Sequence, residues 1–269
     1  MSLKKVLVTG ATGQISNAVF KRLKEQPEKY DVYALDRSAT FSARVPGNWV
    51  LNIPKERLHL CDLTNMEGLQ SAVQGMDVVV HLAADPSPNT WESVLNNNII
   101  GAYNAFEACR QAGVGRIIAA SSITVSNGYP EEEPYKAILE KRYEDVPAGF
   151  PKVSPDIPAK PRSLYASSKV WCESLARTYS HAYGMSCLAI RIGQVERDRP
   201  RPPQGASIFT SVRDIVQIFE LCVNADESLR FDIFYGMSNN DWRWVGIEHA
   251  GDVLGFAPQD RAEDKWTYD

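Results

Sequence analysis

The sequence lacks any apolar run approaching the ~20 residues that a membrane-spanning helix needs, so we predict no transmembrane segment. It has no block of basic residues, and its formal net charge is −4. Neither nucleic acid nor an anionic membrane surface is therefore an expected partner. A strand pattern begins at residue 4 and leaves no room for a signal peptide, which favours a cytoplasmic protein.

Cysteine is scarce and scattered, and no two cysteines form a Cys-x-x-Cys pair. The five residues are Cys61, Cys109, Cys172, Cys187 and Cys222. This distribution favours reduced thiols over a disulfide framework or a zinc site. The four histidines have no ligand spacing either, so the sequence predicts no metal centre.

What the sequence does contain is a regular alternation of strand and helix patterns over 269 residues with 44% hydrophobic content. Such alternation favours a parallel sheet covered on both faces. We find no repeats and no separating linker, so we expect one domain over 1–269. Strands are predicted at 4–9, 30–36, 59–61, 78–84, 116–120, 186–192 and 231–238, and helices from the turn at residue 13 to 25, and at 91–112, 164–183, 210–224 and 242–255.

A glycine-containing turn, Gly10-Ala11-Thr12-Gly13-Gln14-Ile15-Ser16, joins the first strand to the first helix. Gly10 allows a tight turn, and Gly13 lets the backbone approach a pyrophosphate at the positive end of the helix. Ser16 stands where a third glycine is usual, and it is small enough for close helix–strand packing. The pattern predicts a dinucleotide site, with an ordinary strand–helix turn as the alternative.

The second strand ends in Asp36, about 20 residues after the glycine turn, where an acid can accept hydrogen bonds from the adenosine ribose. An acid there repels a 2′-phosphate, which favours NAD over NADP. Arg37 acts in the opposite direction, because an arginine nearby can accommodate that phosphate.

Tyr165 and Lys169 are spaced i, i+4, which places both side chains on one face of the predicted helix 164–183. The lysine charge favours the phenolate and lowers the pKa of the tyrosine, which suits it to move a proton. Ser122 follows the fifth strand and could hold a substrate oxygen. Asn98 requires a partner, either in a structural bond or in a proton relay, and His81 is expected to be a satisfied histidine at a strand end.

Two segments depart from the alternating pattern. Residues 127–162 are rich in Pro and Glu, contain a short helix near 134–143, and form an inserted flap that is either a substrate lid or a solvated loop. The segment up to Gln204 carries Arg197, Arg199 and Arg201, which suit either an anionic substrate or a solvated loop.

Taken together, these features resemble the extended short-chain dehydrogenase/reductase superfamily, in its NAD-dependent epimerase/dehydratase branch. The resemblance covers nearly the whole chain and implies a Rossmann-type doubly wound α/β sheet with a small C-terminal substrate-binding part. It rests on Thr9-Gly10-Ala11-Thr12-Gly13, Asp36, Asp62-Leu63, His81-Leu82-Ala83-Ala84, Asn98-Ile99-Ile100-Gly101, Ser121-Ser122, Tyr165-x-x-x-Lys169 and Arg191-Ile192-Gly193.

The resemblance assigns roles to individual residues. Tyr165 would be the general acid/base, Lys169 would lower its pKa and hold the nicotinamide ribose, Ser122 would bind the reacting oxygen, and Asn98 matches a helix asparagine of the family. The implied contacts to NAD are Gly10, Thr12, Gly13, Gln14, Ile15, Asp36, Arg37, Asp62, Leu63, Leu82, Ala83, Ala84, Asn98, Tyr165, Lys169 and Ile192.

Within the family, the short chain after Gly193 and the segment Phe234–Asn240 look most like the uronate dehydrogenases, which oxidise a free hexuronic acid to its lactone with NAD. An NAD-retaining sugar epimerase and a non-catalytic NAD-sensing module are the alternatives. The resemblance also implies a homodimer through the helices at 91–112 and 164–183. Substrate contacts would come mainly from 194–269, and the implied residues are Pro86, Ser122, Ile123, Thr124, Gln194 and Arg201.

The chain departs from the uronate enzymes around the expected sugar site. Those enzymes carry polar residues where this chain has Pro86, Ile123 and Thr124, and their substrate-binding arginine falls near Gln204. The flap between Ser122 and Tyr165 is also longer than the family usually shows.

Overall fold

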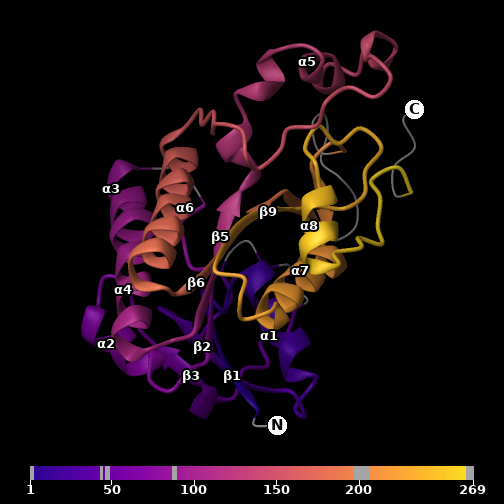
Figure 1. Cartoon of the computed structure of the whole chain (residues 1–269). Coiled ribbons are helices and arrows are strands. Elements are labelled where there is room, and N and C mark those ends of the chain that lie inside the picture. Colours follow the sequence, from indigo (N-terminus) through magenta and orange to yellow (C-terminus); the bar gives the residue numbers. More distant parts are fainter. Residues whose placement is uncertain (1–2, 43–44, 46–48, 87–89, 197–205, 265–269) are drawn as a thin grey trace.

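The structure, a computed structural model, describes residues 3–42, 45, 49–86, 90–196 and 206–264 (Figure 1). Arg197, Arg199 and Arg201, the predicted candidates for an anionic substrate, lie outside the described residues. So does Gln204, near which the substrate-binding arginine of the uronate enzymes falls.

Seven parallel strands form one sheet in the order β3-β2-β1-β4-β5-β6-β9. The order reverses direction between β1 and β4, as in a doubly wound Rossmann-type α/β fold, which confirms the predicted fold class. Ligands of such sheets bind at the carboxyl ends of the strands beside this reversal. The strands are β1 (Lys4–Thr9), β2 (Tyr30–Asp36), β3 (Leu58–Leu60), β4 (Val78–His81), β5 (Arg116–Ser122), β6 (Ser186–Ile192) and β9 (Phe231–Gly236).

Helices cover both faces of the sheet (Figure 1). One face packs against α2, α4 and α6, and the other packs against α1, α7 and α8, each over its own apolar cluster. The central strands are buried on both sides, which explains their nearly continuous apolar sequence. The helices are α1 (Gln14–Lys24), α2 (Met66–Val73), α3 (Trp91–Ser93), a π-helical turn η2 (Val94–Ile100), α4 (Gly101–Ala112), α5 (Tyr135–Leu139), α6 (Leu164–Tyr183), α7 (Val212–Asn224) and α8 (Glu248–Leu254).

The flap, residues 127–162, lies beyond the carboxyl end of β5 and contains α5 with two short 3-10 turns, η4 (Tyr129–Glu131) and η5 (Tyr143–Asp145). Its apolar side chains, including Tyr129 and Ile138, share a buried cluster with Tyr235 and Trp244. The flap is therefore packed against the C-terminal part of the chain.

The predicted helix 242–255 is wrong over its first half, because only Glu248–Leu254 is helical. Val153 of the flap donates its amide to the Trp244 carbonyl at 2.9 Å and accepts the Gly246 amide at 3.0 Å. These bonds hold residues 244–246 in an extended pairing with the flap. Pairing with a distant segment thus overrides the local sequence preference.

Two further differences concern strand ends. The predicted strand 78–84 stops at His81, because the amides of Leu82 and Ala83 donate to the Thr9 hydroxyl at 3.2 and 3.1 Å. A small parallel pair, β7 (Gln194–Glu196) and β8 (Phe209–Ser211), was not predicted, and its second strand takes the start of the predicted helix 210–224.

Candidate active site

The glycine turn leaves the N-terminus of α1 open. Gly13 is the N-cap residue and supplies no side-chain cap, and the first turn of the helix contains no acidic residue. Unpaired amides at the positive end of a helix form an anion site. A Cβ on Gly13 would lie 2.9 Å from Ser16 Oγ, so a side chain there would crowd the turn.

Close packing of the turn also explains why small residues, Gly10 and Ser16, stand at these two positions. Gly10 has φ +68°, and an added Cβ would lie 2.8 Å from the Ala83 Cα at the end of β4. The Ser16 hydroxyl donates to the Gly10 carbonyl. The serine that replaces the third glycine therefore strengthens the turn by a hydrogen bond.

Asp36 is tied to the same turn. Its Oδ2 accepts hydrogen bonds from the Thr12 amide at 2.9 Å and the Thr12 hydroxyl at 2.8 Å. Asp62, at the end of β3, accepts from the amide and hydroxyl of Thr64, and these bonds lower the pKa of its carboxyl. Both acids thus lie at the carboxyl ends of adjacent strands.

His81 is a buried structural residue, as predicted. Its Nδ1 lies 3.0 Å from the Thr9 hydroxyl, which also accepts the amides of Leu82 and Ala83. Burial, and secondarily the charge of Lys169, lower the pKa of His81 to about 3. The neutral imidazole therefore helps to fix the turn that follows β4.

Tyr165, Lys169 and Ser122 are brought together where α6 crosses the end of β5. The Ser163 hydroxyl caps α6 by accepting the Ala166 amide at 3.1 Å. Lys169 is buried; its Nζ donates to the Ala120 carbonyl at 2.8 Å and lies 5.7 Å from the centroid of the Tyr165 ring. The lysine is thus held between the tyrosine and the strand end that carries Ser122.

The hydroxyl of Ser122 begins the 3-10 turn η3 (Ile123–Ser126). It accepts the Thr124 amide at 3.2 Å and the Thr124 hydroxyl at 2.9 Å. Both acceptor positions of the oxygen are occupied, so its own proton remains available for donation to a ligand.

Asn98 lies in the π-helical turn η2, and its side chain is fully engaged. Its amide nitrogen donates to the Asp85 carbonyl at 3.0 Å and to the Ser168 hydroxyl at 3.1 Å, while its oxygen accepts the Asp85 amide at 2.7 Å. The Ser168 hydroxyl donates in turn to the Tyr165 carbonyl. These bonds join the segment after β4 to α6, and a part for Asn98 in a proton relay stays a prediction.

The remaining predicted residues occupy the same edge of the sheet. Leu82, Ala83, Ala84 and the exposed Pro86 follow β4, Ile123 and Thr124 follow Ser122, Ile192 pairs with Ser122 across β5 and β6, and Gln194 begins β7. Ile123 is buried and Thr124 is half-buried, so the turn presents little polar surface beyond its two hydroxyls.

Sequence reasoning missed a buried charged pair, Glu173 on α6 and Arg191 on β6. The available signal was an arginine in the otherwise apolar run of β6 and a glutamate one helical turn after Lys169.

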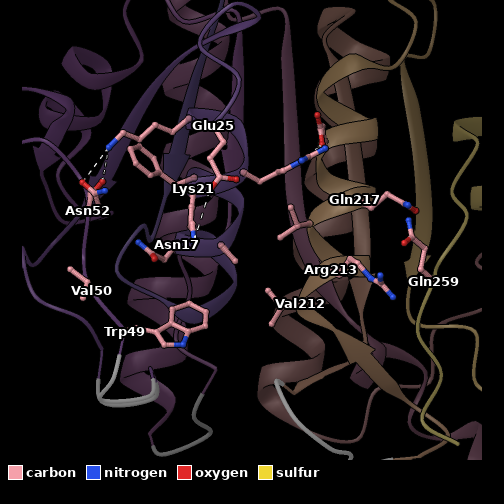
Figure 2. Close-up of a pocket in the computed structure, with 16 residues that line it drawn as sticks. Asn17, Lys21, Glu25, Trp49, Val50, Asn52, Val212, Arg213, Gln217 and Gln259 are labelled. Carbon is pink, nitrogen blue, oxygen red and sulfur yellow. Dashed lines mark hydrogen bonds and ion pairs between the residues drawn. The ribbon is translucent and has the colours of Figure 1, made fainter. Parts of the chain in front are cut away.

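Two cavities lie near these elements. A groove of about 930 Å³ is lined by residues of α1, of α7 and of the segment Trp49–Asn52, which lies on the other side of α1 from α7 (Figure 2). Ser122, Tyr165 and Lys169 do not line it. A second pocket of about 390 Å³ lies between the flap and Trp244, and Asn127 and Arg162 contribute to its lining.

Within the described part of the chain, no group of three or more His, Cys, Asp or Glu side chains is placed to hold a metal ion. The same residues include no helix with the length and apolar character needed to cross a bilayer.

A sequence model of the NAD dependent epimerase/dehydratase family matches residues 6–217. The chain is 30% identical over 262 residues to the NAD-dependent glucose-6-phosphate dehydrogenase of Haloferax volcanii, covering 96% of this chain and 94% of that protein. It is 33% identical over 261 residues to the uronate dehydrogenase of Agrobacterium fabrum, with 97% and 86% covered.

The chain is also similar to solved structures of uronate dehydrogenases. The uronate dehydrogenase from Agrobacterium tumefaciens superposes with a TM-score of 0.78 at 32% identity, covering 98% of this chain and 87% of that one. A variant of that enzyme in complex with NAD also has a TM-score of 0.78, at 31% identity, with the same coverage.

This chain belongs to the NAD-dependent epimerase/dehydratase family of extended short-chain dehydrogenases/reductases. It is an NAD-dependent oxidoreductase, and NAD is its cofactor. The uncapped amides of α1 and the acid at the end of β2 fit a dinucleotide.

Proposed function

We propose that the protein oxidises a free sugar or sugar acid at a hydroxyl-bearing carbon, with Tyr165 as the general base. One observation carries the proposal. Lys169 is bound to the end of β5 beside Ser122, with the Tyr165 ring one helical turn away and the open glycine turn at the same edge of the sheet.

Bound NAD would supply the hydride acceptor. The amides at Gln14 and Ile15 would hold its pyrophosphate, and Asp36 its adenosine ribose. Gly13, whose own amide donates to the Gly10 carbonyl at 2.8 Å, would let the backbone approach the pyrophosphate closely. The full proposed set of contacts is the one given from the sequence, and it includes Asp62, Leu63, Leu82, Ala83, Ala84 and Ile192 at the ends of β3, β4 and β6.

The proton chemistry would then be divided among three side chains. The free proton of Ser122 would be donated to the reacting substrate oxygen. Tyr165 would take the hydroxyl proton as the hydride leaves, and Lys169 would favour the phenolate form. A positioned acid/base of this kind contributes about 10²–10⁴-fold to the rate.

For the substrate we propose a free hexose derivative that carries an anionic group, with a hexuronic acid oxidised to its lactone as the specific candidate. Glucose-6-phosphate dehydrogenase and uronate dehydrogenase, the two relatives compared, are both named for such sugars. We further propose that residues 194–269 and the flap enclose the substrate, with the flap as a lid. Support comes from the 390 Å³ pocket between the flap and Trp244, which adjoins Asn127 at the end of η3.

The test is the absorbance of NADH in mixtures of the protein, NAD and single sugars. The panel holds glucuronate, galacturonate, glucose 6-phosphate, glucose and arabinose, with NADP in place of NAD as the control. NADH formation with a uronate supports the specific proposal, and formation with another sugar corrects the substrate. Sugar isomerisation without NADH accumulation would instead favour the epimerase alternative.

We also propose a homodimer formed through α3, α4 and α6. These helices and the turn η2 between α3 and α4 expose several large apolar side chains, which are Trp91, Ile100, Tyr103, Leu164, Trp171 and Tyr183. An apolar surface of this kind favours association. A cytoplasmic location is proposed as well, since all five cysteines are buried free thiols.

A further inference from the structure

A row of polar side chains crosses the sheet immediately below the catalytic strand ends. Ser121 on β5, Arg191 on β6 and Tyr235 on β9 are paired in register, and their side chains all reach the α6 side of the sheet. The corresponding positions further down β5 and β6 are apolar and buried, and those on β9 are apolar and half-buried. A polar row inside an apolar layer therefore requires a specific explanation.

Glu173 on α6 connects this row to the helix that carries Tyr165 and Lys169. Arg191 donates from Nε and Nη2 to the two Glu173 oxygens at 2.8 and 3.0 Å, and the Ser121 hydroxyl donates to the same carboxylate at 2.6 Å. The side chains of Glu173 and Arg191 are 7% and 3% exposed. Glu173 lies one helical turn after Lys169, on the same face of α6.

The other end of the row reaches around the catalytic turn. Arg191 Nη1 donates to the Tyr235 hydroxyl at 3.0 Å, and that hydroxyl lies 2.7 Å from the Ser126 hydroxyl. Because an arginine only donates, the Tyr235 oxygen accepts from it and can donate onward to Ser126. Ser121 precedes Ser122 and Ser126 ends η3, so the network holds both ends of the turn that presents Ser122.

Stability alone does not account for this arrangement. Removing two charges from water costs several kcal/mol, and apolar replacements of similar volume are often neutral or stabilising. A bidentate arginine–carboxylate pair does fix relative position and orientation closely. What the pair adds is therefore a fixed distance between α6 and the end of β5.

We propose that Glu173, Arg191 and Tyr235 are positioning residues that set Ser122 relative to Tyr165 and Lys169. The assignment rests on the proposed catalytic roles of those three residues. A misplacement of about 1 Å caused from outside the reacting groups can cost about 10²-fold in rate. Loosening the network should therefore lower kcat and leave the KM for NAD unchanged, since the glycine turn and Asp36 lie on other strands.

The decisive comparison uses two tyrosine-to-phenylalanine variants. Tyr235→Phe removes the buried bonds to Arg191 and Ser126. Tyr179→Phe removes a partly buried bond from a hydroxyl to the Glu107 carboxylate, on α6 but away from the catalytic turn. We expect Tyr235→Phe to lower kcat about tenfold or more. Tyr179→Phe should lower only the melting temperature.

A substrate-independent measurement accompanies the kinetics. Hydrogen exchange of the amides in residues 122–127 should be faster in Tyr235→Phe and unchanged in Tyr179→Phe. If no sugar in the panel is oxidised, this exchange comparison alone decides the positioning proposal, and the silent panel counts only against the proposed function. Equal behaviour of the two variants in both measurements overturns the proposal.

A second variant separates position from stability. Ser121→Ala, Glu173→Leu and Arg191→Met together replace the charged centre by apolar side chains. We expect a melting temperature equal to or above that of the parent protein, with reduced kcat and faster exchange at 122–127. Full activity in this stable variant would show that the network does not position the catalytic turn.

Discussion

At the scale of single residues, Asp36 is expected to decide the choice of dinucleotide. Its carboxylate anchors the glycine turn through Thr12. In the proposed binding mode it would place a negative charge where NADP carries its 2′-phosphate. Asp36→Ala removes charge-assisted hydrogen bonds, so the KM for NAD should rise about tenfold or more. Activity with NADP should improve relative to NAD, because the repelling acid is gone and Arg37 beside it can accommodate a 2′-phosphate.

Steady-state kinetics with both dinucleotides measures this change. Asp31→Ala is the control, since Asp31 lies at the other end of β2 and pairs with Arg57. An unaltered preference for NAD in Asp36→Ala would mean that the acid does not contact the ribose.

The role of Tyr165 gives a second prediction at this scale. Tyr165→Phe removes the phenolic hydroxyl and keeps the ring beside Lys169. The rate should fall by about 10²–10⁴-fold, the contribution of a positioned acid/base. NAD binding, followed by calorimetry, should persist because the glycine turn is untouched. A variant that retains most of its rate would mean that Tyr165 is not the general acid/base.

At the scale of elements, Glu107 on α4, which also bonds to α6, predicts a pH dependence of stability. Glu107 on α4 accepts hydrogen bonds from Arg110 and from the Tyr179 hydroxyl, and these lower its pKa from 4.5 to about 2, with the Arg110 bond as the largest cause. A carboxyl whose pKa is depressed by folding stabilises the fold above its unfolded pKa. That contribution is lost as the pH falls from about 4.5 toward 2.

Melting temperatures measured between neutral and acidic pH test this contact. Glu107→Gln should be less stable than the parent protein at neutral pH, and the difference should shrink in acid. Glu92→Gln, on the exposed surface of α3, is the control and should match the parent throughout. A constant difference at all pH values would contradict the assignment to ionised Glu107.

Local sequence signals predicted the elements whose structure is decided locally. The predicted bounds of α6 match the structure, and they are set by local features: Ser163 caps one end, and Gly184 adopts φ +68° at the other. The bounds of β1, β2 and β6 followed from buried apolar runs between polar turns. Residues 242–246 and β7–β8 were missed because their partners lie far away in sequence, and no local periodicity records such pairing.

The residues of the candidate site also fall into those that the sequence could predict and those that it could not. Gly10, Gly13, Asp36, Ser122, Tyr165 and Lys169 could be selected because their order along the chain matches strand ends of a parallel sheet. The buried pair of Glu173 and Arg191 could not be assigned a partner from sequence, since charged side chains are usually solvated. Only the sheet register, which places Ser121, Arg191 and Tyr235 in one row, reveals it.

At the scale of the whole molecule, the apolar side chains on α4 and α6 predict the oligomeric state. Tyr103 and Trp171 are 46% and 39% exposed. Burial of such side chains between two copies would drive association, at roughly 25 cal/mol per Å² of apolar surface. The variant Tyr103→Glu/Trp171→Glu should sediment as a monomer while the parent protein sediments as a dimer.

Val253→Glu is the matched control, because Val253 is an exposed apolar residue of α8 on the opposite face of the sheet, at 42%. It should leave the sedimentation coefficient unchanged. Both variants should bind NAD as the parent does, because the glycine turn and Asp36 lie outside α4 and α6. A parent protein that sediments as a monomer at all concentrations would remove the dimer proposal and leave these aromatic residues as an ordinary exposed surface.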